Sequence, residues 1–194
     1  MVKFLRRQPS EESEVPDPLL SELAFPRPLD PEADPRQLAR EIAHKLEIIQ
    51  SRSKKIRLLQ AAAESDAAWS TPLLVELLGD PTEEVRDIAV RELITREDCP
   101  LDDLCERLTR PPWFSKSAAL RILAAKRSRS TARAVRAVVE DTNADVRRSA
   151  AVALGEIGGA EARALLVRLA KDKSPYVRAA AVAGLDKVCE FKFI

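Results

Sequence analysis

The sequence predicts an all-α fold, an α-solenoid of about five helical hairpins that follows a mostly irregular N-terminal leader. One pattern recurs along the chain at a spacing of about thirty residues, which is typical of stacked helix pairs. Aromatic residues make up only 4% of the chain, so the core must consist of Ala, Leu and Val, which suits closely packed helices. Each copy has an aspartate and, six residues later, an arginine: Asp80 and Arg86, Asp141 and Arg147, and Asp172 and Arg178.

Composition and cysteine content indicate a folded protein of a reducing compartment. Apolar residues make up 45% of the 194 residues and charged residues 32%. The three cysteines form no C-x-x-C pair, which argues against a disulfide framework and against a zinc site. No apolar run is long enough to span a membrane, and the basic start at residues 1–7 is not followed by the apolar stretch of a signal peptide. We therefore expect a cytoplasmic protein.

The chain divides into a leader at residues 1–34, a repeat array at 35–188 and a tail at 189–194. Residues 8–35 hold seven of the thirteen prolines and eight acids against one base, a net charge of 1 − 8 = −7. Proline at this density disfavours regular helix and the acid load disfavours collapse, so an extended or disordered leader is expected. Residues 17–25 can form one short helix, which either covers the first repeat or docks on a partner.

Helical spacing of apolar residues and helix-capping residues place the five hairpins. Ordered helix begins at the N-cap Asp34 and Pro35, and Thr82 is expected to cap the second helix of repeat two. The expected pairs are 35–49 with 54–64, 71–79 with 82–96, 100–108 with 112–125, 132–140 with 143–157, and 161–171 with 174–188.

Repeat three departs from the pattern. Phe114 takes the place of the valine that the other copies share, and Ser115 takes the place of the arginine. Arg110 stands near the aspartate position. This loss predicts a bend or a soft spot in the array.

The unit resembles a HEAT repeat, specifically the short thirty-residue kind found in bacterial proteins and in the phycobilin-lyase group. The resemblance covers about residues 36–188 and is strongest in repeats two, four and five. In that family the turn aspartate and the second-helix arginine form a ladder between neighbouring repeats. The resemblance implies a structural ladder made by Asp80, Arg86, Asp141, Arg147, Asp172 and Arg178.

The residues that catalysis requires are scarce. His44 is the single histidine, so the two-histidine metal motifs are excluded. The glycines at 155–159 follow a predicted helix and lack the Lys-Ser/Thr of a phosphate loop, so they mark a helix end. The sequence indicates no enzyme and no cofactor.

Two surfaces are candidates for binding. The concave face of a HEAT array, lined by second helices, is expected to hold another protein, and its exposed positions are Asp87, Arg91, Lys116, Arg121, Arg148 and Val152. A basic band without acids crosses into repeat four and suits anions: Lys126, Arg127, Arg129, Arg133 and Arg136.

Two alternative functions remain open at this point. The first is nucleic-acid binding through the basic band, extended to residues 116–148, although residues 36–194 carry only 28 − 23 = +5. The second is a subunit of a phycobilin-lyase-type enzyme, which would need a partner chain or a pigment. The charge of the leader also suggests that it covers the basic band until a partner displaces it.

Overall fold

The computed structural model describes residues 34–190 of the chain. The leader up to residue 33, with the short helix predicted at 17–25, lies outside the described residues, as do residues 191–194 of the predicted tail. Between residues 34 and 190 all regular elements are helical: ten α-helices and two short 3-10 segments. The protein is an all-α solenoid, as the sequence predicts.

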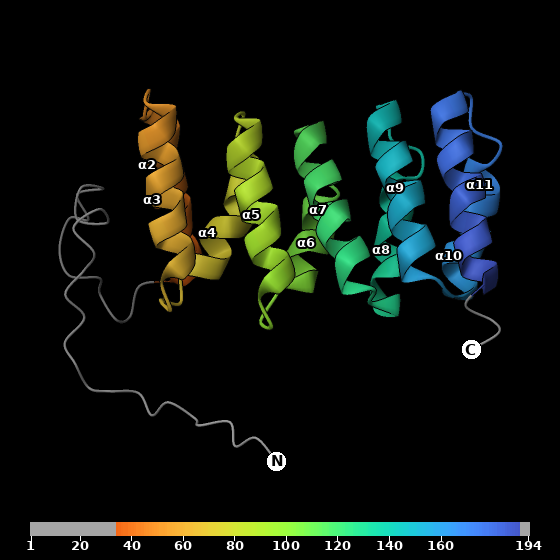
Figure 1. Ribbon diagram of the computed structural model, residues 1–194, viewed down its shortest axis with the longest axis horizontal. Helices are drawn as coiled ribbons and strands as arrows, with labels where there is room; N and C mark the ends of the chain where they lie inside the picture. Colours follow the sequence, from red (N-terminus) through yellow and green to blue (C-terminus); the bar gives the residue numbers. More distant parts are fainter. Residues whose placement is uncertain (1–33, 191–194) are drawn as a thin grey trace, which may run out of the picture.

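Five helical hairpins stand in a row along the molecule, in chain order from α2 to α11 (Figure 1). Each hairpin is one repeat, and its two members are called here its first and its second helix. The pairs are α2 (Pro35–Ile48) with α3 (Arg52–Glu64), α4 (Ser70–Leu77) with α5 (Glu83–Thr95), α6 (Leu101–Arg107) with α7 (Trp113–Lys126), α8 (Ala132–Val135) with α9 (Ala144–Ile157), and α10 (Gly159–Leu169) with α11 (Pro175–Glu190).

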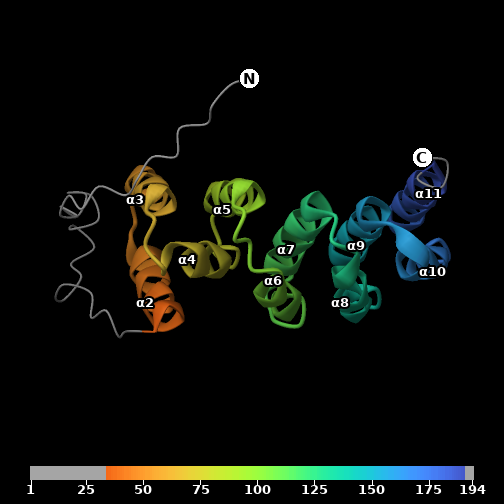
Figure 2. The same ribbon diagram turned by 90° about the horizontal axis from the view of Figure 1, so that it is seen from below.

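The hairpins form two layers, with the second helices on one side and the first helices on the other (Figure 2). The core between the layers consists almost wholly of Ala, Val, Leu and Ile, with Trp69 as its one buried tryptophan. We call the exposed side of α3, α5, α7, α9 and α11 the second-helix face.

Capping side chains start several helices. Asp34 accepts a hydrogen bond from the Arg36 N–H at 3.0 Å, followed by proline at the first helical position, and Ser51 and Asn143 cap α3 and α9 in the same way. Thr82 stands at the N-cap of α5 but makes no capping hydrogen bond, so that part of the prediction is wrong.

The first helix of repeat four is not one regular helix. The sequence predicts residues 132–140, but the α-helical part is only Ala132–Val135, flanked by 3-10 turns at Arg129–Thr131 and Arg136–Val138. No side-chain capping bond holds these short pieces, and the β-branched Val135, Val138 and Val139 lower their helix propensity.

The register predicted for repeat three is wrong by one residue. Ser115 is fully buried at the position of Val85 and Val146, whereas Phe114 is only half-buried. Lys116, not Ser115, therefore occupies the arginine position. A small hydroxyl residue stands where an aliphatic one was expected, which is why matching by hydrophobicity selects the neighbouring phenylalanine.

The C-terminal boundary also shifts slightly, because α11 continues to Glu190 and includes two residues assigned to the tail. None of the described helices combines the length and the apolar character that crossing a membrane requires.

Candidate functional site

Neighbouring repeats are joined by a ladder of ion pairs that runs along one edge of the second helices. In each pair a cation near the start of a second helix meets the aspartate in the loop of the following repeat, not that of its own repeat. The pairs and their distances are Lys55–Asp80 at 2.6 Å, Lys116–Asp141 at 2.7 Å and Arg147–Asp172 at 2.7 Å.

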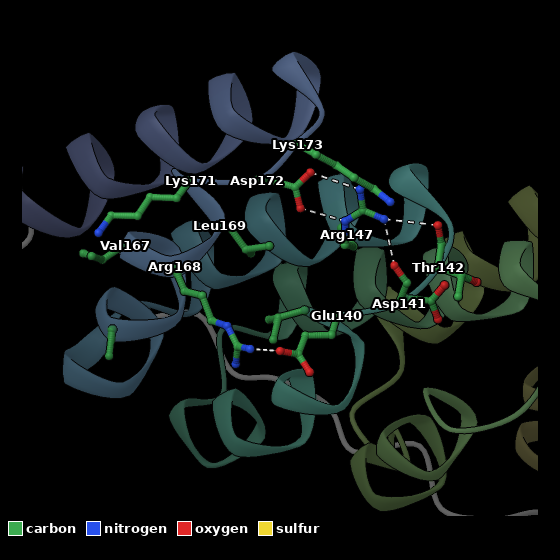
Figure 3. Close-up of a pocket in the computed structure, with 12 residues that line it drawn as sticks. Glu140, Asp141, Thr142, Arg147, Val167, Arg168, Leu169, Lys171, Asp172 and Lys173 are labelled. Carbon is green, nitrogen blue, oxygen red and sulfur yellow. Dashed lines mark hydrogen bonds and ion pairs between the residues drawn. The ribbon is translucent and has the colours of Figure 1, made fainter.

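Arg147 makes the most complete of these connections (Figure 3). Its Nε and one terminal nitrogen donate to the two carboxylate oxygens of Asp172 at 2.7 and 3.0 Å. The other terminal nitrogen donates to the backbone carbonyls of Asp141 at 2.8 Å and Thr142 at 3.2 Å. One side chain thus fixes the loop of its own repeat and holds the next repeat against it.

The remaining two ladder arginines lack a carboxylate partner within residues 34–190. Arg86 donates to the carbonyls of Asp80 and Pro81, and its guanidinium carbon lies 4.5 Å from the centre of the Phe114 ring. At the ladder position between repeats two and three, a cation–π contact therefore stands in place of an ion pair. Arg178 donates to the Asp172 and Lys173 carbonyls and is otherwise exposed at the end of the described array.

The ladder favours the ionised form of Asp141 and Asp172. Hydrogen bonds from Arg147 lower the pKa of the Asp172 carboxyl below its ordinary value and outweigh burial, which raises it. Burial raises the pKa of Asp141, but the hydrogen bonds from Lys116 and the Asn143 N–H, together with nearby positive charge, lower it further than burial raises it. These carboxylates serve as fixed anions that hold the repeats in place.

The second-helix face carries a row of equivalent exposed positions, one for each repeat. Their spacing of 31, 30, 31 and 31 residues follows the repeat, and all five side chains are exposed. From the first repeat to the last the row changes from polar through basic to apolar: Gln60, Arg91, Arg121, Val152 and Ala183.

The six residues predicted to bind a partner fall into three groups. Arg91, Arg148 and Val152 are exposed on this face, with Val152 46% exposed. Asp87 and Arg121 also lie there but form an ion pair at 2.7 Å between α5 and α7. Lys116 differs, because its side chain is only 19% exposed and belongs to the ladder, so the structure uses it inside the fold.

The five cations of the predicted basic band do not form one free positive surface in the structure. Lys126 donates to the Arg96 carbonyl at the end of α5, 2.6 Å away. Arg127 pairs with Glu156 at 2.8 Å and Arg136 with Glu161 at 3.3 Å. Of the five predicted cations, Arg129 and Arg133 are exposed without an ion-pair partner among residues 34–190. Acids from other repeats thus neutralise part of a stretch that contains none of its own.

An open groove of about 730 Å³ lies beside the ladder between repeats four and five (Figure 3). Its floor is the Arg147–Asp172 pair, and Arg168 and Glu140 form a further ion pair across it. Lys171 and Lys173 line its rim and are exposed. Val139, Val167 and Leu169 also line it, so the groove is a mixed surface of paired charges and apolar side chains.

The groups expected to be chemically inactive have ordinary surroundings. His44 is exposed on α2, with its Nδ1 3.7 Å from Glu47. Burial raises the pKa of the Cys99 and Cys105 thiols, which opposes formation of a reactive thiolate. Among residues 34–190 there is no group of three or more His, Cys, Asp or Glu that could hold a metal ion.

Sequence reasoning missed Lys55 and Lys116 as ladder residues. Both occupy the sequence position that the ladder arginines hold in the other repeats. The spacing is 31, 30, 31 and 31 residues along the series Lys55, Arg86, Lys116, Arg147 and Arg178. The period counted backward from Arg178 is the signal that identifies them, since lysine supplies the same positive charge as arginine at these positions.

Comparison with known proteins finds one family. Residues 101–186, most of repeats three to five, match the model of a family described as HEAT repeats. A solved crystal structure of an engineered protein is 17% identical, covers 89% of this chain and 79% of its own, and has a TM-score of 0.43. No curated protein matches the sequence.

Proposed function

We propose that this protein is a non-catalytic adaptor that holds another protein on its second-helix face, the face that the sequence predicts to be concave. HEAT arrays commonly serve as interaction scaffolds, and such solenoids bind along an extended surface that many repeats share. The adaptor role, the absence of catalysis and a cytoplasmic location all belong to this proposal.

The exposed row on the second-helix face is the observation that carries the proposal. Its side chains stand on adjacent parallel helices, which pack about 8–10 Å apart, so five repeats present a strip of regularly spaced contacts. Arg91, Arg148 and Val152 are exposed and have no ion-pair role within residues 34–190. Basic side chains beside a half-exposed valine suit a partner segment that is acidic in one part and apolar in the next.

Two triple variants of the full chain test this surface. The first, Arg91→Glu with Arg148→Glu and Val152→Asp, should lose the proteins that wild type retains on affinity purification from its host. The matched control changes the first-helix layer: Arg133→Glu with Arg163→Glu and Val167→Asp. Val167 is 45% exposed, close to the 46% of Val152, and all four arginines are exposed.

The control should keep the bound proteins, provided that circular dichroism shows both variants folded. Loss of the same proteins from both variants, or from neither, contradicts the assignment of this face. The spacing of the ladder cations supports the finer proposal that these are HEAT repeats of the short, bacterial, phycobilin-lyase-like type.

A further inference from the structure

The outer side of α11 is a repeat-to-repeat contact surface that no repeat covers within residues 34–190. Each second helix carries a stripe that begins with its ladder cation and continues four and eight residues later, which places the three side chains on one side of the helix. In the first four repeats the cation of the stripe contacts the following repeat, and the side chain four residues later is buried. The stripes are Lys55/Leu59/Ala63, Arg86/Val90/Ile94, Lys116/Leu120/Ala124, Arg147/Ala151/Gly155 and Arg178/Val182/Asp186.

The fourth stripe shows how this surface is used. Arg147 is 4% exposed and Ala151 is fully buried, and a Cβ added at Gly155 would lie 2.7 Å from the Gly184 Cα of α11. The equivalent side of α11 is open: Val182 is 51% exposed, and Arg178 and Asp186 are exposed as well. Half-buried Leu185 lies beside them.

The last stripe also differs chemically from the other four. The third position is Ala, Ile, Ala or Gly in the first four repeats but Asp186 in repeat five. A carboxylate therefore stands four residues after Val182, and the ladder arginine stands four residues before it.

We propose that α11 pairs with α11 of a second copy of this chain, antiparallel, around a two-fold axis at Val182. Arg178 of each copy then lies opposite Asp186 of the other, because the two residues are equally far from Val182. The axis brings the two Val182 side chains together, with Leu185 beside them, and supplies the missing carboxylate of the last ladder arginine. A two-fold contact is self-complementary and closes at two subunits.

Charge decides between this arrangement and the other ways to cover the same surface. A two-fold axis parallel to the helices would place Arg178 beside Arg178 and Asp186 beside Asp186, which is repulsive. Stacking α11 on repeat one of another copy would offer Arg178 the loop at residues 49–51, where the aspartate position is Ile49. Only the antiparallel pairing satisfies both charges.

Cross-linking of single cysteines tests the position of the axis. In full-length protein with the exposed Cys189 replaced by Ser, Val182→Cys should form a covalent dimer under mild oxidation, since a residue on the axis meets its own copy at disulfide distance. Val152→Cys is the matched control, with the same residue type at nearly the same exposure, on α9. Equal cross-linking of both variants overturns the proposal.

Charge reversal tests the pairing itself. Sedimentation of wild type, from low micromolar to several hundred micromolar, should show a monomer–dimer equilibrium. Arg178→Glu and Asp186→Arg should each weaken it about ten-fold or more through like-charge contacts, and the double variant should recover most of the loss. Arg148→Glu, exposed on α9 away from this surface, should leave it unchanged.

A wild-type chain that stays monomeric over this range, or a double variant no better than the single ones, overturns the proposal. Residues 191–194 follow α11 directly and contain Phe191 and Phe193, so they are the competing occupant. If Phe191→Ser with Phe193→Ser dimerises where wild type does not, the tail covers this surface and the second copy does not.

Discussion

Arg147 is a charged side chain held almost entirely inside the protein. Its side chain is 5% exposed and that of its partner Asp172 is 9% exposed, and every polar atom of the guanidinium has an acceptor. Removing one member of a buried pair leaves the other charge without solvent or partner, which costs far more than the pair itself contributes. Substitution of either Arg147 or Asp172 should therefore weaken the contact between repeats four and five.

Replacing Arg147 by Met should lower the free energy of unfolding by about 3–5 kcal/mol, because Asp172 stays buried and unpaired. Denaturation in urea followed by circular dichroism measures the change. Arg121→Met is the control, since the Arg121–Asp87 pair is half-exposed, and it should cost less than about 1 kcal/mol. Equal losses for the two variants would contradict the buried role of Arg147.

The pH dependence of stability follows from the same carboxylate. Since the folded state lowers the pKa of Asp172, the stabilisation is present above the unfolded pKa of about 4 and is lost as the pH falls through the lower folded value. The difference in unfolding free energy between wild type and Asp172→Asn should be constant near neutral pH and shrink below about pH 4. A difference that does not change down to about pH 2 would show that the charge of Asp172 is unimportant.

At the residue scale, the repeat pattern predicts the positions of the aspartates and arginines, and the resemblance implies a ladder between neighbouring repeats. Neither says which cation each aspartate binds. The repeat pattern shows that Asp172 and Arg178 recur together, although Asp172 binds Arg147 of the preceding repeat. Only the stacking of the hairpins, a tertiary property, determines that choice. The sequence also does not predict the burial of Ser115, because the hydrophobic pattern favours Phe114 as the buried residue of this turn.

At the scale of elements, α9 and α11 approach each other backbone to backbone. Gly155 of α9 faces the backbone of α11 at Gly184, and Gly184 in turn faces Leu166 and the Ala151 carbonyl. Because Gly155 and Gly184 have no side chains, the backbones of α9 and α11 can come into contact. The sequence predicts a helix end at Gly155, whereas in the structure Gly155 lies inside α9 and packs against α11.

Gly155→Ala should destabilise the protein by about 1–2 kcal/mol despite a better helix propensity, because overpacking a closely packed site costs more than the propensity gains. Gly184→Ala should cost less. A Cβ added there would lie 2.9 Å from the end of the flexible Leu166 side chain and 3.1 Å from the Ala151 carbonyl oxygen, whereas one added at Gly155 would lie 2.7 Å from the Gly184 backbone. Thermal unfolding of the two variants measures the order, and the reverse order would show that Leu166 cannot move.

At the scale of the whole molecule, ion pairs between repeats join charges that lie far apart in the sequence. Arg127 and Glu156 are 29 residues apart, and Arg136 and Glu161 are 25 apart, yet each pair is in contact. A basic band read from sequence therefore overestimates the free positive charge. The spacing of about thirty residues can be read from the sequence, so the array of hairpins is predictable. The contacts between repeats depend on how the hairpins stack, which the sequence alone does not show.

The junction of repeats two and three should be the first to open. At the ladder position it has a cation–π contact where the other three junctions have an ion pair. The ion pairs that do join these two repeats, Arg121–Asp87 and Arg107–Glu76, lie away from the ladder. Solenoids can open locally between weakly coupled repeats. Hydrogen exchange with mass spectrometry should find lower protection in α5 and α7 than in α9, and uniform protection along the array would contradict this expectation.

The direction of the ladder has a consequence for how the chain is made. Each cation precedes its carboxylate, with 25 residues between Lys116 and Asp141 and again between Arg147 and Asp172. During synthesis a finished hairpin therefore presents a lone positive charge until the loop of the following one emerges from the ribosome. We therefore expect each newly synthesised repeat to pack onto the repeats already folded before it, so that folding advances from the N-terminal side at the pace of translation.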